Sequence, residues 1–104
     1  MAIKEVMMEE LKNSRQMADD YEAALARLPK GNLIRKKIKG RDYFYLQVRD
    51  GGKVRFDYVK NPSVAMIEKY RRAKAARVKY RSLLAQAKRQ IKFLERIVRA
   101  RQAV

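Results

Sequence analysis

The last part of the chain, from Ser63 to Val104, contains no glycine or proline. Its apolar residues recur at alternating spacings of four and three, a pattern typical of coiled-coil helices because it puts them on one stripe. Asn61 and Pro62 suit the N-cap and the first helical position. The sequence therefore predicts a helix over residues 62–103, with Asn61 as its N-cap. The stripe consists of Ile67, Tyr70, Ala73, Tyr80, Leu84, Ala87, Ile91, Leu94 and Val98.

A second stripe of this kind lies in residues 2–28. Its members are Met7, Leu11, Ser14, Ala18, Tyr21, Leu25 and Leu28. Pro29 ends this predicted helix, because proline disfavours helical geometry in the residue before it. Neither helix can bury its stripe alone, so we expect an antiparallel pair of the two. The second helix is longer, and we expect an overhanging C-terminal part that suits another protein or a second copy, giving a homodimer. The residues expected at that interface are Ile91, Leu94, Ile97 and Val98.

Between the helices, residues 33–59 are rich in strand-forming residues and are divided by glycines, which predicts a three-stranded antiparallel β-meander. A three-residue loop at residues 50–52 would make one face wholly apolar, whereas a two-residue loop would oppose Leu46 to Asp57. The pattern therefore favours three-residue loops, here and at residues 40–42. Phe56 would then be buried, and its replacement by alanine would cost roughly 3–5 kcal/mol. The expected apolar pairs are Val48 with Val54, Leu46 with Phe56, and Phe44 with Tyr58.

The opposite face of this meander would carry basic and tyrosine side chains. Such a face suits nucleic acid, because Lys and Arg neutralise phosphates while tyrosine rings stack on bases. A basic sheet can also lie in a groove of duplex DNA. An acidic protein surface, or a sheet kept soluble by its charges, remains as an alternative. The candidate nucleic-acid-binding residues are Arg35, Lys37, Lys39, Arg41, Tyr43, Tyr45, Arg49, Lys53 and Arg55 in the meander, and Arg71, Arg72, Lys74, Arg77 and Arg81 in the second helix.

The charge of the chain is unevenly distributed. The formal net charge is +16, with −2 in residues 1–29, +7 in residues 30–61 and +11 in residues 62–104. A large positive charge that is concentrated in one part of the chain indicates a surface that binds a polyanion. We therefore expect DNA or RNA, or a nucleoprotein complex, as the partner.

The composition excludes several functions. Cys and His are absent, which rules out disulfides, zinc fingers and thiol or imidazole catalysis. Asp19, Asp20 and Glu22 point apart on a helix, so we expect no metal and no cofactor. No apolar run approaches the ~18 residues of a membrane span, and the acidic N-terminal segment does not suit a signal peptide. We expect a cytoplasmic protein that is not an enzyme and does not bind membranes.

The stretch KGNLIRKKIKGRDYFYLQVRDGGKVRFDYV resembles a module of small prokaryotic proteins often found on mobile elements, in which a basic strand, a tyrosine-rich strand and a Gly-Gly-Lys turn precede a third strand. It is also similar to the three-stranded arm-type DNA-binding domains of tyrosine integrases. That resemblance implies contact between the sheet and a DNA groove. This sequence differs from the integrases in its long helices and in having no catalytic domain, so the resemblance does not imply integrase activity. The residues that would make the DNA contact are Arg35, Lys37, Tyr43, Tyr45, Arg49 and Arg55.

The sequence thus predicts a single α+β domain over residues 1–104, an antiparallel coiled-coil-like pair of long helices with an inserted β-meander. The expected function is non-catalytic binding of nucleic acid or of a nucleoprotein complex. A small, basic, cysteine-free protein of this kind also fits a phage-type inhibitor, as anti-CRISPR proteins are. Such an inhibitor would hold a Cas effector or its guide RNA. Composition does not separate these two functions.

Overall fold

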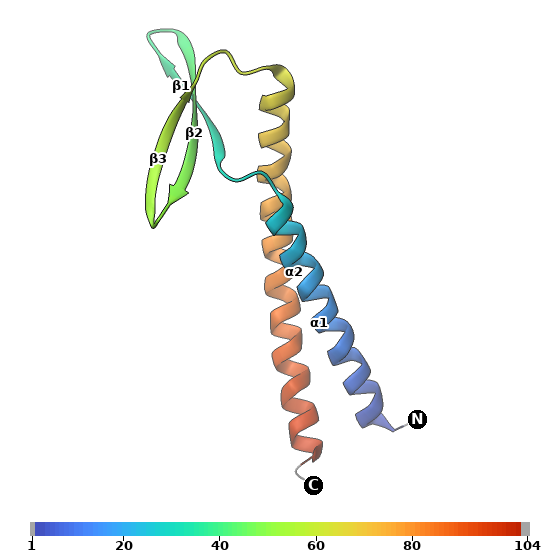
Figure 1. The fold of residues 1–104 in the computed structure, drawn as a ribbon. Helices are drawn as coiled ribbons and strands as arrows, with labels where there is room; N and C mark the ends of the chain where they lie inside the picture. Colours follow the sequence, from blue (N-terminus) through green and yellow to red (C-terminus); the bar gives the residue numbers. More distant parts are fainter. Residues whose placement is uncertain (1, 103–104) are drawn as a thin grey trace. The chain divides into compact units, whose positions relative to one another are not determined.

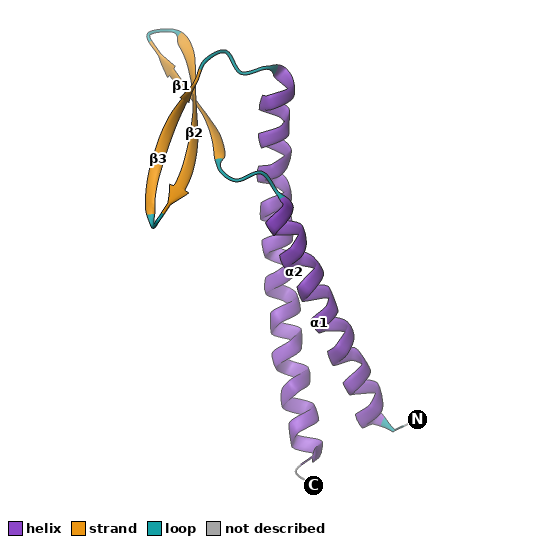
Figure 2. Ribbon diagram, viewed as in Figure 1, coloured by secondary structure: helices purple, strands orange, loops and turns teal. Residues whose placement is uncertain are grey.

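The computed structural model describes residues 2–102 and has two long helices with a three-stranded sheet between them in the sequence (Figure 1). The sheet has the order β1-β2-β3 and both strand pairs are antiparallel (Figure 2). The predicted α+β class, with a helix pair and an antiparallel meander, is confirmed. The elements are α1 (Ile3–Arg27), β1 (Asn32–Ile38), β2 (Arg41–Asp50), β3 (Lys53–Val59) and α2 (Val64–Gln102).

The chain forms two compact units. The helical unit consists of α1 and of α2 from Arg77 onward. The sheet unit consists of residues 28–76, which include the three strands and the first part of α2. The long second helix therefore contributes to both units.

The core of the helical unit lies along the predicted stripes. Leu11 of α1 and Leu94 and Val98 of α2 form a buried cluster, in which Leu94 is 3% exposed. The rings of Tyr21 and Tyr80 lie next to each other, with centroids 6.2 Å apart. Because residues near the start of α1 meet residues near the end of α2, the pair is antiparallel, as predicted.

The predicted overhang at the C-terminal end of α2 is wrong. Leu94 and Val98 are buried against Leu11 within the chain, Ile91 packs against the same cluster, and Ile97 is half-buried. The reason is the alignment of the pair, since α1 pairs with the part of α2 that starts at Arg77. The excess length of α2 therefore lies at its N-terminal end, in the sheet unit. This stripe is not left uncovered for a second copy.

The start of α2 is fixed by Ser63 and not by Asn61. The backbone N–H of Met66 donates to Oγ of Ser63 at 3.0 Å, and the N–H of Ile67 donates to the carbonyl oxygen of Ser63 at 3.0 Å. Ser63 is therefore the N-cap, and the helix begins at Val64. Asn61 has a φ of 48°, a left-handed conformation that asparagine tolerates better than most residues. The predicted cap was two residues too early.

Replacing Ser63 with alanine is expected to lower the free energy of unfolding by about 1 kcal/mol, because the N–H of Met66 loses its side-chain acceptor. Ser82→Ala is the matched control, since Ser82 is exposed in the interior of α2. Alanine favours the helix there, so that control should be neutral or slightly stabilising. Urea unfolding followed by circular dichroism measures both variants. Equal stabilities would contradict the assigned cap.

Both hairpins close with two-residue turns. The register pairs Asp50 with Lys53, which leaves Gly51 and Gly52 as the turn with φ values of 56° and 84°. Ile38 pairs with Arg41 in the same way. The turn residues left there are Lys39 and Gly40, with φ values of 50° and 79°. Two successive positive φ values are typical of the type I′ turn, whose twist matches that of the strands it joins. The predicted three-residue loops are therefore wrong.

This register opposes Leu46 to Asp57 and Gln47 to Phe56, so the expected wholly apolar face does not form. The acidic residue opposite Leu46 is accommodated by ion pairs. Arg55 donates from Nε to Oδ1 of Asp57 at 2.9 Å and from Nη1 to Oδ2 of Asp50 at 2.8 Å. These ion pairs on β3 thus stabilise a face that mixes apolar and charged residues, which the apolar pattern of the sequence alone does not predict.

Candidate nucleic-acid interface

The register divides the strand residues between two faces, because directly opposed residues share a face and successive residues alternate. We call the face that includes Tyr45 the aromatic face. Its residues are Asn32, Ile34, Lys36, Ile38, Arg41, Tyr43, Tyr45, Gln47, Arg49, Val54, Phe56 and Tyr58. We call the opposite face the mixed face. Its residues are Leu33, Arg35, Lys37, Asp42, Phe44, Leu46, Val48, Asp50, Lys53, Arg55, Asp57 and Val59.

The rings of the aromatic face are in contact with one another. The ring centroid of Tyr58 lies 5.6 Å from that of Tyr45 and 6.4 Å from that of Tyr43. Nζ of Lys36 lies 5.4 Å from the ring centroid of Tyr45 and 5.2 Å from that of Phe56. All three strands therefore contribute to one cluster of four rings and an ammonium group.

The part of this cluster on β3 is open to solvent. Phe56 is 49% exposed and Tyr58 is 56% exposed, whereas Asp57 and Val59, which alternate with them on the mixed face, are half-buried. The prediction that Phe56 is buried is therefore wrong. Large apolar side chains left exposed side by side indicate a contact surface for a partner.

Charge also distinguishes the two faces. Asp42, Asp50 and Asp57, the acidic residues of the segment 32–59, all lie on the mixed face. The aromatic face carries three basic residues and, within that described segment, no acidic one. They are Lys36, Arg41 and Arg49. The face with most of the aromatic rings thus carries positive charge without a carboxylate of its own.

The mixed face, in contrast, meets α2 within the sheet unit. Leu33 and Phe44 line a cavity of about 300 Å³ together with Ile67 and Tyr70 of α2. The polar residues around the same cavity are Asn32, Arg35, Arg71 and Lys74. Apolar residues of both elements face this cavity, so the mixed face supplies the inner side of the sheet unit.

The structure separates the predicted binding residues of the meander. Arg41, Tyr43, Tyr45 and Arg49 remain together on the aromatic face, whereas Lys39 lies in the first turn. The remaining four lie on the mixed face, against the prediction of one shared outer face, because the shorter turns shift the pairing by one residue. These four residues are Arg35, Lys37, Lys53 and Arg55.

Arg55 is held by two carboxylates, which changes its role. Its bonds to Asp57 and Asp50 raise the pKa of the guanidinium above its ordinary value, with the hydrogen bond to Asp57 as the main cause. An arginine engaged in this way has its positive charge already balanced. We therefore assign Arg55 to the ion pairs of β3 and not to a phosphate contact.

The predicted residues of α2 divide between the two units. Arg71 and Arg72 donate to Glu68, from Nε at 2.9 Å and 3.1 Å. These bonds, chiefly that from Arg71, lower the pKa of Glu68 to about 2. Lys74 lies at the cavity of the mixed face. Arg77 and Arg81 belong to the helical unit.

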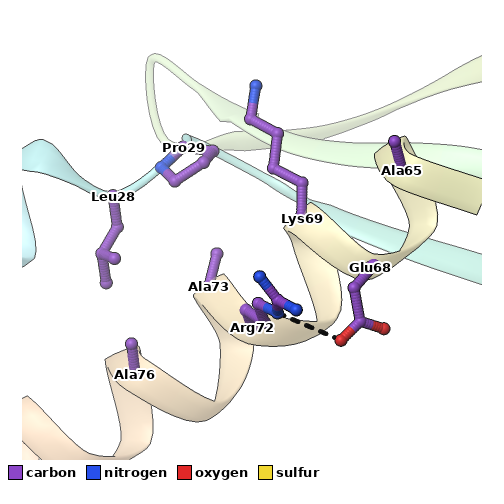
Figure 3. A pocket seen from close by; sticks show the side chains of 8 residues that line it. All are labelled: Leu28, Pro29, Ala65, Glu68, Lys69, Arg72, Ala73 and Ala76. Carbon is purple, nitrogen blue, oxygen red and sulfur yellow. Dashed lines mark hydrogen bonds and ion pairs between the residues drawn. The ribbon is translucent and has the colours of Figure 1, made fainter.

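A second cavity lies where the chain leaves α1 and passes along α2. Leu28 and Pro29 lie over Ala73 and Ala76, and Figure 3 shows the Glu68–Arg72 ion pair at its side. Ala73 is buried, and the charged pair is satisfied internally. We interpret this cavity of about 590 Å³ as the packing site of the connecting segment on α2.

Sequence reasoning missed Lys36, Phe56 and Tyr58 as site residues. For β3 the signal was present in the second turn, since Gly-Gly is typical of a two-residue type I′ hairpin. Given that turn, the pairing follows and places Phe56 and Tyr58 on the face of Tyr45. The position of Lys36 depends on the first turn, Lys39-Gly40, whose signal is weaker. The alternation of the strand residues then assigns every aspartate of the meander to the other face.

Between residues 2 and 102 there is no group of three or more Cys, His, Asp or Glu side chains that could hold a metal ion. No helix of the described segment combines the length and the apolar character needed to cross a membrane. Within the described residues of the sheet, the aromatic face combines exposed rings with basic residues and carries no acidic one.

These features define a class, that of small basic α+β proteins that expose an aromatic and positively charged sheet face. The chain belongs to the family described as a domain of unknown function, DUF6788, whose model matches residues 8–69. The matched segment includes most of α1, the entire sheet and the N-cap of α2. No curated protein and no solved structure matches the chain.

Proposed function

We propose that this protein binds nucleic acid, without catalysing a reaction, through the aromatic face of its sheet. The observation that carries this proposal is the exposure of Phe56 and Tyr58 on a face that holds basic residues and no acidic ones. Basic side chains neutralise phosphates and release counterions, while exposed rings stack on bases. The face offers both groups within one cluster.

The position of Lys36 supports this proposal. Its ammonium group lies over the rings of Tyr45 and Phe56, a cation–π contact that at an exposed site contributes only about 0.5–1 kcal/mol. A contact this weak can be exchanged for a phosphate without large cost. Lys36 would then neutralise the backbone while the rings it covered become available to a base.

The exposed rings favour nucleic acid over an acidic protein as the partner of this basic chain. A net charge of +16 attracts any polyanion over a distance and speeds its encounter with the chain. An acidic protein surface would use the cations but would need no row of exposed rings. Nucleic acid uses both, because each nucleotide presents a phosphate and a planar base.

The triple variant Lys36→Ala, Arg41→Ala and Arg49→Ala tests the proposed surface. We expect weaker binding and a slope of log K against log salt concentration that is smaller by about 2–3, since each phosphate contact contributes about 0.7–0.9. Fluorescence anisotropy with a labelled oligonucleotide at several salt concentrations measures both quantities.

A control removes the same number of positive charges from the mixed face, by Arg35→Ala, Lys37→Ala and Lys53→Ala. Its slope should change by less than about 1, because only the long-range attraction is reduced. Equal effects of the two triple variants would mean that binding does not use the aromatic face. A wild-type protein that binds no nucleic acid at low salt would overturn the proposed function.

A further inference from the structure

We infer that the aromatic face takes unpaired bases, so that the partner is a single-stranded segment of DNA or RNA and not the groove of a duplex. This inference rests on the proposed function and specifies its ligand. Three observations support it: the distance between the exposed rings, the side-chain amide opposite one of them, and the positions of the basic residues.

The spacing of the exposed rings does not fit a stacked duplex. Phe56 and Tyr58 lie two residues apart on β3, which corresponds to roughly 6.8 Å along the strand. Successive bases of a duplex strand are only about 3.4 Å apart and cover each other's faces. A nucleic acid that places one base on each ring must therefore be extended, with its bases separated from one another.

A side-chain amide lies beside Phe56. Gln47 is directly opposite Phe56, and both are on the aromatic face. An amide both donates and accepts hydrogen bonds, so it can pair with the edge of a base. The edges used in base pairing are open to such contacts only when the base is unpaired. A base stacked on Phe56 would have the amide of Gln47 on the neighbouring strand.

The cations are distributed along the ring cluster. Arg41 is the first residue of β2 and Arg49 is close to its end, while Lys36 lies over the rings between them. The backbone of an extended strand can follow such a line while its bases turn towards the rings. Grooves that bind single strands combine tracked phosphates with stacked bases in this way.

The test compares three labelled ligands of the same length, about 12 nucleotides, on the full chain: a single strand, the same strand annealed to its complement, and an abasic strand with equal phosphates. We expect the single strand to bind at least about tenfold more tightly than either of the others, because stacking of one base is worth at least about fivefold in affinity and two rings are available. Anisotropy titrations at one salt concentration give the three affinities.

Single substitutions assign the difference to the rings. Phe56→Ala and Tyr58→Ala should each weaken single-strand binding by about 5- to 100-fold and leave the affinity for the abasic strand within about twofold. Val54→Ala is the matched control, since Val54 is also exposed on the aromatic face of β3 but has no ring. It should change neither affinity by more than about twofold.

A variant that keeps apolar bulk separates stacking from folding. Phe56→Leu should fold as the wild type does, by circular dichroism, and still lose single-strand affinity. Wild-type affinity in that variant would overturn the inference. Equal binding of the single and abasic strands, or tighter binding of the duplex, would also overturn it while leaving the proposed function in place. Binding of none of the three ligands would remove both.

Discussion

Replacing Leu94 with alanine is expected to lower the free energy of unfolding by about 3 kcal/mol. Leu94 is the least exposed residue of the buried cluster with Leu11 and Val98, and Leu→Ala substitutions in such positions typically cost about 2–5 kcal/mol. In a chain of this size that loss corresponds to a fall of roughly 12–24 °C in the melting temperature. Thermal and urea unfolding followed by circular dichroism measure the effect.

Phe93→Ala is the control for this substitution. Phe93 directly precedes Leu94 in the helix and has the larger side chain, but it is 54% exposed. Its replacement should cost less than about 1 kcal/mol, because little apolar surface is returned to water. If both variants lost the same stability, the buried stripe of α2 would not be where the structure has it.

The two helices could be predicted from the sequence because their signal is local. In a helix, alternating spacings of three and four place residues such as Leu11 and Leu94 on one stripe, independently of the structure of the rest of the chain. The alignment of the two stripes is not local. A short loop would fix it, but here the connection contains an entire sheet, and this allowed α1 to pair with the C-terminal part of α2. The overhang was therefore predicted at the wrong end.

The sheet illustrates a different limit. Its strands are recognisable in the sequence, but the rule that one face should be wholly apolar predicts the wrong register. That rule presumes that the most apolar face is buried, whereas Phe56 and Tyr58 are exposed. The local chemistry of Gly51-Gly52 decides the turn instead, and a shift of one residue turns every side chain of β3 to the other face.

The candidate site was affected in the same way. Residues of β2 were assigned to one face correctly, because alternation within a single strand needs no register. Tyr43, Tyr45 and Arg49 therefore stay together, and Arg41, expected in the loop at residues 40–42, joins them as the first residue of β2. Residues of β1 and β3 depended on the turns, and so Arg55 was expected beside the tyrosines while the structure pairs it with aspartates.

Two phenylalanines of the sheet provide a direct test of its register. Phe44→Ala is expected to cost about 2–4 kcal/mol, somewhat less than a fully buried aromatic, because Phe44 is half-buried on the mixed face beside Ile67 and Tyr70. Phe56→Ala should cost less than about 1 kcal/mol, because Phe56 lies on the exposed aromatic face.

Amide hydrogen exchange in β2 is the suitable measurement, since it reports the opening of the sheet even where the helical unit stays folded. Three-residue loops would place Phe56 on the same inner face as Phe44, and the two substitutions would then cost similar amounts. The comparison uses one residue type in one sheet, so the size of the removed side chain is the same, and the difference reports the burial of each ring together with the central position of β2 and the edge position of β3. A cost for Phe44→Ala well above that for Phe56→Ala would show that the ring of Phe56, proposed to bind a base, is not required to hold the sheet together.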